Sequence, residues 1–170
     1  MHSLGINIGS SSIKAVLMDE EKMLWHKIIE HEGDFLTTLK NFITGSDIPA
    51  GTKLLVTGTE GRYLINANNV IESICVEETL RELEIETDAV VSLGGENFVV
   101  YTIDNNGKII TSFSGNKCAS GTGEFFKQQL GRMDMKLNDI FNVSDTAKPH
   151  PLSSRCSVFM KSDCTHKLNK

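Results

Sequence analysis

Three glycine-containing segments of the sequence have the residue types that can hold an anion. They cover residues 7–14, 93–97 and 121–123. Glycine lets the backbone approach an anion closely, while the N–H groups of a tight turn and serine hydroxyls can donate hydrogen bonds to it. The candidate binding residues are Gly9, Ser10, Ser11, Ser12, Lys14, Gly94, Gly95, Gly121, Thr122 and Gly123.

The first segment, residues 7–14, is predicted to be a tight turn between two strands, with Lys14 adding positive charge. It is not a Walker A loop, because no Gly-Lys-Ser/Thr element follows. A Ser/Gly turn without any ligand is the alternative interpretation. Gly95 lies at the place in the second half that corresponds to Gly9. Two glycine hairpins that face each other across a cleft could clamp a polyphosphate.

Two cysteines, Cys118 and Cys156, each precede a predicted helix. Free N–H groups at a helix N-terminus favour the thiolate, the form of cysteine that reacts or ligates a metal. A buried thiol beside a helix cap is the alternative. Neither cysteine belongs to a Cys-x-x-Cys pair, so their spacing alone does not indicate a metal. Cys164 and His166 could add ligands for zinc, but one such pair is a weak signal.

The elements that must position these residues form two similar series. In the first half, apolar patterns predict strands at 4–8, 13–17, 23–29 and 53–57, and helices at 35–43 and 75–85. Asp34 is the expected N-cap of the first of these helices. The second half restarts with strands at 89–93, 98–103 and 108–113, a hairpin signal at Asn106-Gly107, and a helix through Phe126, Leu130 and Met133.

Both halves follow the order strand, glycine-rich turn, strand, turn, strand, helix, which predicts a duplicated α/β unit. We expect one lobe over residues 1–87 and a second over 88–170. The second series continues only into a polar helical segment from Ser157, so we expect this lobe to be incomplete and the chain to be part of a longer protein.

Composition argues against several classes of protein. The chain has 170 residues and a net charge of −5, which argues against a nucleic-acid partner because such partners require clustered Lys and Arg. No apolar run approaches the roughly 20 residues of a membrane span, and the N-terminus does not look like a signal peptide. Four cysteines are too few for a disulfide scaffold. We therefore expect a cytoplasmic protein.

Other polar and aromatic residues carry less information. Trp25 is expected to pack against its neighbours, and the acidic run from Glu77 to Glu86 is expected to be a solvated helix face. The histidines lie in predicted turns, strand edges or loops without an identifiable partner, so no Ser-His-Asp arrangement is indicated.

Three longer motifs carry a resemblance to a known family. They are Asn116-Lys-Cys-Ala-Ser-Gly-Thr-Gly123, Ser153-Ser-Arg-Cys-Ser-Val-Phe159, and Thr57-Gly-Thr-Glu-Gly-Arg62, which resembles a Thr-Gly-x-Gly-Arg loop with one extra residue. Together they resemble the ATP-dependent activators of 2-hydroxyacyl-CoA dehydratases and the related ATPase subunits of benzoyl-CoA reductase, within the actin, Hsp70 and sugar-kinase superfamily. The resemblance covers almost the whole chain.

The resemblance implies two ribonuclease-H-like α/β lobes (an actin-like ATPase fold), with ATP and magnesium in the cleft and the phosphates on the two hairpins. It implies that Cys118 and Cys156 hold half of a [4Fe–4S] cluster. Two thiolates cannot complete a four-cysteine cluster, so a homodimer must supply the other two. The reduced cluster would pass an electron to an acyl-CoA dehydratase or reductase component.

The phosphate hairpins depart from the family pattern. Asn7 and Ser92 replace the aspartates that begin the two hairpins, and Glu96 and Asn97 replace Gln-Asp in the second. Fewer carboxylates suit a hard dication less well. Glu96 is the candidate catalytic residue, because it could position water, although it would also repel the γ-phosphate.

These departures leave alternatives to an ATP-dependent activase that uses Cys118 and Cys156. One is a catalytically degenerate regulatory or docking module within a dehydratase-activase protein, favoured by Asn7, Ser92 and Asn97. Another is a sugar- or acid-kinase relative, against which the cysteine and Gly-Thr-Gly motif argues.

Overall fold

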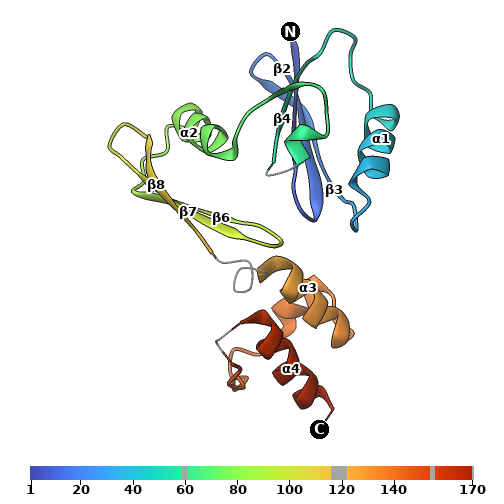
Figure 1. Ribbon diagram of the computed structural model, residues 1–170, viewed down its shortest axis with the longest axis vertical. Coiled ribbons are helices and arrows are strands. Elements are labelled where there is room, and N and C mark those ends of the chain that lie inside the picture. Colours follow the sequence, from blue (N-terminus) through green and yellow to red (C-terminus); the bar gives the residue numbers. More distant parts are fainter. Residues whose placement is uncertain (59–60, 116–121, 154–155, 170) are drawn as a thin grey trace. The chain divides into compact units, whose positions relative to one another are not determined.

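The chain is described by a computed structural model that covers residues 1–58, 61–115, 122–153 and 156–169 (Figure 1). Candidate residues Cys118 and Gly121 lie outside these ranges, as do Thr59 and Glu60 of the third motif.

The described chain forms two compact units. The first contains residues 1–89 and 102–111, and the second contains 90–101 and 112–170. The division therefore passes through the second sheet, and the tip of one hairpin groups with the first unit. The expected lobe boundary between residues 87 and 88 stays a prediction.

The first unit contains a five-stranded mixed sheet. Its strands are β1 (His2–Ile8), β2 (Ser12–Asp19), β3 (Lys22–Glu30), β4 (Lys53–Thr57) and β5 (Asn68–Asn69). They lie in the order β3-β2-β1-β4-β5, in which the first three form antiparallel pairs and β1, β4 and β5 are parallel. The first four strands confirm the predictions, whereas the two-residue β5 is too short to leave a sequence pattern.

The core of this unit lies between one face of the sheet and helix α1 (Phe35–Gly45) (Figure 1). Alternate residues of β1 are buried on that face, as a period of two requires. Helix α1 contributes Leu39 and Phe42. Asp34 caps the helix as predicted, because its Oδ1 accepts a hydrogen bond from Thr37 N at 3.2 Å.

Helix α2 (Glu72–Glu82) starts and ends three residues earlier than predicted. Its acidic face is only partly solvated, which corrects the expectation for Glu77. Glu77 Oε2 accepts a hydrogen bond from Lys108 Nζ at 2.9 Å and Oε1 accepts one from Ile109 N at 2.8 Å. These bonds attach the tip of the hairpin to α2, which explains why the tip groups with the first unit.

The second sheet has the strands β6 (Ala89–Leu93), β7 (Phe98–Ile103) and β8 (Ile109–Ser114) in sequential order. All three were predicted, with β8 shifted by one residue. In the β7–β8 turn only Gly107 has a positive φ, of 76°, because Asp104 Oδ1 accepts the N–H groups of Asn106 and Lys108 and closes a longer turn.

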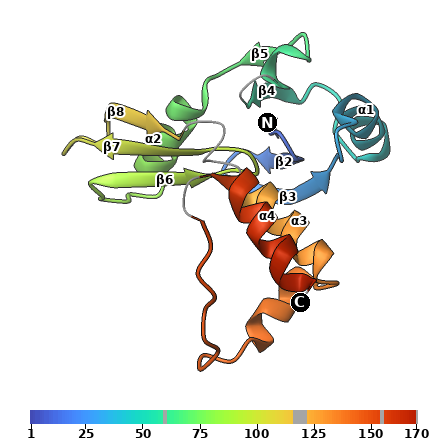
Figure 2. The ribbon, with the colours of Figure 1, turned by 60° about the horizontal axis from the view of Figure 1, so that its bottom comes forward.

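Helices α3 (Thr122–Arg132) and α4 (Ser157–Leu168) complete the second unit and lie side by side (Figure 2). Arg132 Nη1 donates a hydrogen bond to Thr165 Oγ1 at 2.7 Å between them. Both helices were predicted. Short 3₁₀ helices at Gly61–Tyr63 and Leu137–Asn142 were not. None of the helices in the described ranges has the length and apolar character that a bilayer crossing requires.

Candidate functional site

Two glycine turns, one in each unit, close with the same hydrogen bond. Gly9 N donates to Ser12 O at 3.0 Å, and Gly94 N donates to Asn97 O at 2.8 Å. Gly94, rather than the predicted Gly95, is therefore the counterpart of Gly9. The common closing bond supports the predicted duplication of the strand–turn–strand unit.

Close packing explains why both turns begin with glycine. A Cβ atom at Gly94 would lie 2.9 Å from Asn97 Oδ1 and 3.0 Å from Asn97 O. One at Gly9 would lie 3.1 Å from Ser12 O. A side chain at either position would push against the atom that closes the turn.

The first turn presents hydrogen-bond donors and a cation. Within the described ranges, the N–H groups of Ser10 and Ser11 have no hydrogen-bond partner. Lys14 Nζ donates to Ser12 Oγ at 3.1 Å, which holds the ammonium group beside the turn. Successive free N–H groups next to a positive charge are suited to an oxyanion. The structure therefore brings together all five residues predicted for this turn.

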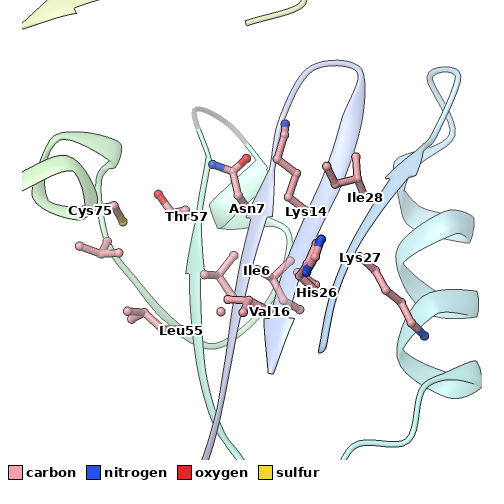
Figure 3. A pocket seen from close by; sticks show the side chains of 14 residues that line it. Ile6, Asn7, Lys14, Val16, His26, Lys27, Ile28, Leu55, Thr57 and Cys75 are labelled. Carbon is pink, nitrogen blue, oxygen red and sulfur yellow. The ribbon is translucent and has the colours of Figure 1, made fainter. Parts of the chain in front are cut away.

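A row of polar side chains crosses the sheet at the base of the turn (Figure 3). Asn7 on β1 pairs in register with Lys14 on β2 and with Thr57 on β4, and Figure 3 shows the three side chains next to one another. The Thr57 hydroxyl is buried and has no hydrogen-bond partner within the described ranges. Asn7 and Thr57 lie at the carboxyl ends of parallel strands, the usual place for ligands in α/β sheets.

An open cavity of about 360 Å³ continues from this row along the same face of the sheet (Figure 3). It is lined mainly by apolar residues, among them Ile6, Val16 and Leu55, and Cys75 contributes to its wall. Figure 3 thus shows the polar row at one end of an apolar surface. Polar ligand groups would be held at the row.

The loop after β4 packs tightly against the residue that precedes Gly9. Gly58 has a φ of 115°, and a Cβ atom there would overlap Ile8 O. A Cβ atom at Gly61 would overlap the Ile8 side chain. Arg62 Nη1 donates to Gly58 O at 2.9 Å. Gly58 and Gly61 of the third motif therefore pack against Ile8, the residue before the first glycine turn.

His31 is a residue of this site that sequence reasoning missed. It is 5% exposed, and its Nε2 atom lies 3.1 Å from Gly9 O. Its backbone N–H donates to Ser11 O at 3.3 Å. The contact joins residues 22 positions apart, so no local pattern could have identified it.

In the second unit, helix α3 begins against the second glycine turn. Glu124 N donates to Gly95 O at 2.8 Å, and a Cβ atom at Gly123 would lie 3.1 Å from Gly94 O. The two segments that were predicted separately as anion sites thus form one cluster, in which Thr122 is the first residue of α3. Glu96, the candidate catalytic residue, is exposed at the turn.

Cys156 is half-buried and immediately precedes α4, as predicted, without capping the helix through its side chain. A helix N-terminus favours a negative charge such as that of a ligating thiolate. Its predicted partner Cys118 lies outside the described residues. Within the described ranges, no group of three or more His, Cys, Asp or Glu side chains could hold a metal ion.

Comparisons with known proteins found related sequences. An uncharacterized protein of Methanocaldococcus jannaschii is 33% identical over 175 residues, covering 98% of this chain and 70% of that protein. The 2-hydroxyisocaproyl-CoA dehydratase activator of Clostridioides difficile is 24% identical, with 100% of this chain and 67% of the activator covered. No protein-family model matches the chain.

The fold is likewise that of a solved protein. The structure of the 2-hydroxyisocaproyl-CoA dehydratase activator from Clostridium difficile, with bound ADPNP, superposes with a TM-score of 0.81 at 24% identity and covers 99% of this chain. This chain spans 66% of that structure, so it corresponds to about two thirds of its relatives' length. The agreement confirms the predicted actin-like α/β fold.

Proposed function

Because this chain belongs to the family of the 2-hydroxyacyl-CoA dehydratase activators, we propose that it is the nucleotide-binding part of an ATP-dependent activase. The complete activase would couple ATP binding and hydrolysis to electron transfer from a [4Fe–4S] cluster to an acyl-CoA dehydratase. The dehydratase is the proposed partner, and a homodimer is the proposed assembly.

The observation that carries the proposal is the repeated glycine turn. Each unit has a turn closed by the same Gly N–H bond, with free donors and Lys14 at the first and the start of α3 at the second. These features suit the phosphates of a nucleotide. A solved relative has ADPNP bound, which supports a nucleotide as the ligand.

The polar row could bind magnesium, but only weakly. Asn7 and Thr57 offer neutral oxygen atoms, and the Thr57 hydroxyl, which has no partner among the described residues, could bind the ion or its water. Mg²⁺ retains several waters and prefers carboxylates, so these residues would hold it through water. We expect weak binding of Mg-ATP and slow hydrolysis, with Glu96 as the group that could position water.

Cys118 and Cys156 are the proposed ligands of an iron–sulfur cluster. Cys156 supplies one half-buried sulfur at a helix N-terminus, and Cys118 is the proposed second ligand. A [4Fe–4S] cluster would supply one-electron transfer, and its four thiolates would come from two copies of the chain.

Anaerobic reconstitution with iron and sulfide, followed by EPR spectroscopy after reduction, tests the proposal. We expect a cluster signal that is lost in Cys118→Ala and Cys156→Ala but retained in the matched variants Cys75→Ala and Cys164→Ala. A signal that survives loss of either proposed ligand would rule out the assignment.

The alternative is a regulatory or docking module that binds nucleotide without hydrolysing it. The absence of carboxylates at Asn7 and Ser92 favours it. Such a module would bind the dehydratase component, but Mg-ATP turnover would be absent even after cluster reconstitution. Measuring ATPase activity and partner affinity on the same sample separates the two functions.

A further inference from the structure

His31 contacts the first glycine turn twice, through its side chain and through its backbone. We propose that His31 is a positioning residue that fixes this turn in the shape that binds phosphate oxygens. The proposal rests on the proposed function, because it assigns the turn to a phosphate-bearing ligand.

The hydrogen bonds of the ring define its tautomer. Gly33 N–H donates to His31 Nδ1 at 3.1 Å, so Nδ1 is the acceptor and carries no proton. The proton of the neutral ring is therefore on Nε2, which donates to Gly9 O at 3.1 Å. Both ring nitrogens are used, and this fixes the orientation of the imidazole.

The bond to Gly9 O determines where the next amide points. In a trans peptide the C=O and the following N–H point in opposite directions. Because Gly9 O points at the His31 ring, Ser10 N–H points away from it. This N–H is one of the two in the turn that have no partner within the described ranges. The His31 ring thus orients the Ser10 N–H so that it can donate a hydrogen bond to an oxyanion.

The surroundings of His31 make it a rigid support. The ring meets Phe35 edge-on, with centroids 6.0 Å apart, and Asp34 N donates to His31 O at 2.7 Å. Phe35 is the first residue of α1. The turn is therefore fastened to the start of this helix through His31.

The test compares His31→Gln, which retains a donor near the Nε2 position, with His31→Leu, which has none. The matched control is His150→Leu, an exposed histidine of the second unit that does not line the cavity. Folding is followed by urea denaturation with Trp25 fluorescence, and binding by calorimetry with Mg-ADPNP and with tripolyphosphate. We expect His31→Leu to weaken binding of both ligands about tenfold, and His31→Gln and His150→Leu to stay within about threefold.

Two measurements need no nucleotide. Imidazole ¹⁵N resonances should show a protonated Nε2 and a bare Nδ1, and amide hydrogen exchange at Gly9, whose N–H closes the turn, should accelerate in His31→Leu alone. A proton on Nδ1, or unchanged exchange and unchanged binding in a folded His31→Leu protein, would overturn the inference. Wild-type protein that binds neither ligand, with the ring tautomer as described, would overturn the proposed function and the ligand role of His31 with it.

Discussion

Asn7 and Thr57 are paired in register at the carboxyl ends of β1 and β4, where the buried Thr57 hydroxyl has no hydrogen-bond partner in the described part of the chain. A buried unpaired hydroxyl costs about 1–3 kcal/mol. A ligand, an ion or its water that bonds to Thr57 would recover that free energy. A negative charge added at this end of the sheet should therefore strengthen the binding of Mg-ATP.

Asn7→Asp is expected to tighten Mg-ATP binding about tenfold or more. The new carboxylate would supply the negative charge that Mg²⁺ prefers, next to the Thr57 hydroxyl. Calorimetric titration in the presence of magnesium measures the gain, and the gain should disappear when EDTA removes the metal.

Asn69→Asp is the matched control, because Asn69 is exposed on β5 and the substitution changes the net charge equally. An equal gain in both variants would show a general electrostatic effect rather than a metal site at Asn7. Tight Mg-ATP binding by the unmodified chain would contradict our interpretation of the missing carboxylates.

Gly58→Ala is expected to destabilise the protein by roughly 3 kcal/mol or more. The substitution adds a Cβ atom at a positive φ where Ile8 O already occupies the space. Gly51→Ala is the control, because its φ is 78° but nothing lies within 4 Å of the added atom. Its expected cost is about 1–2 kcal/mol. Equal losses in urea denaturation would show that backbone strain alone, and not the packing on Ile8, restricts Gly58.

Glu77 should make stability depend on pH. The hydrogen bond from Ile109 N, followed by that from Lys108, lowers the pKa of Glu77 below its usual value of 4.5. Its stabilisation is therefore complete above pH 4.5 and is lost as the pH falls through the lower pKa of the folded state. Glu77→Gln should lower the melting temperature at neutral pH, and the difference from wild type should shrink in acid.

The exposed residue Glu86 provides the control for that titration, because Glu86→Gln makes the same chemical change at a solvated position. Its melting curve should match that of the wild type at every pH. A Glu77→Gln deficit that persists unchanged at low pH would attribute the effect to packing instead of charge.

Phe42→Ala should cost about 3–5 kcal/mol, because Phe42 on α1 is 6% exposed and belongs to the core. Its ring meets Trp25 edge-on at 5.9 Å, so Trp25 fluorescence should also change in the native state. Phe141→Ala removes the same side chain at a position that is 86% exposed, and its cost should stay within about 0.5 kcal/mol. Comparable losses would contradict the assignment of the core.

Local patterns predicted most of the secondary structure. The alternation in β1, the cap at Asp34 and the glycines that interrupt the strands each depend on residues that are near in sequence. Their physical basis is short-ranged, because side-chain periodicity and turn geometry are set within a few residues. The resemblance of longer motifs then indicated the family that the comparisons support.

The partners of individual polar groups were decided only by the tertiary structure. His31 Nε2 meets Gly9 O, Thr57 stands beside Asn7, and Glu77 binds the start of β8 instead of facing solvent. Even the match between the two glycine turns, Gly9 with Gly94, required the hydrogen bonds that close them. Sequence patterns specify which face of an element is buried, whereas the group that a buried donor meets depends on strand register and packing between distant segments.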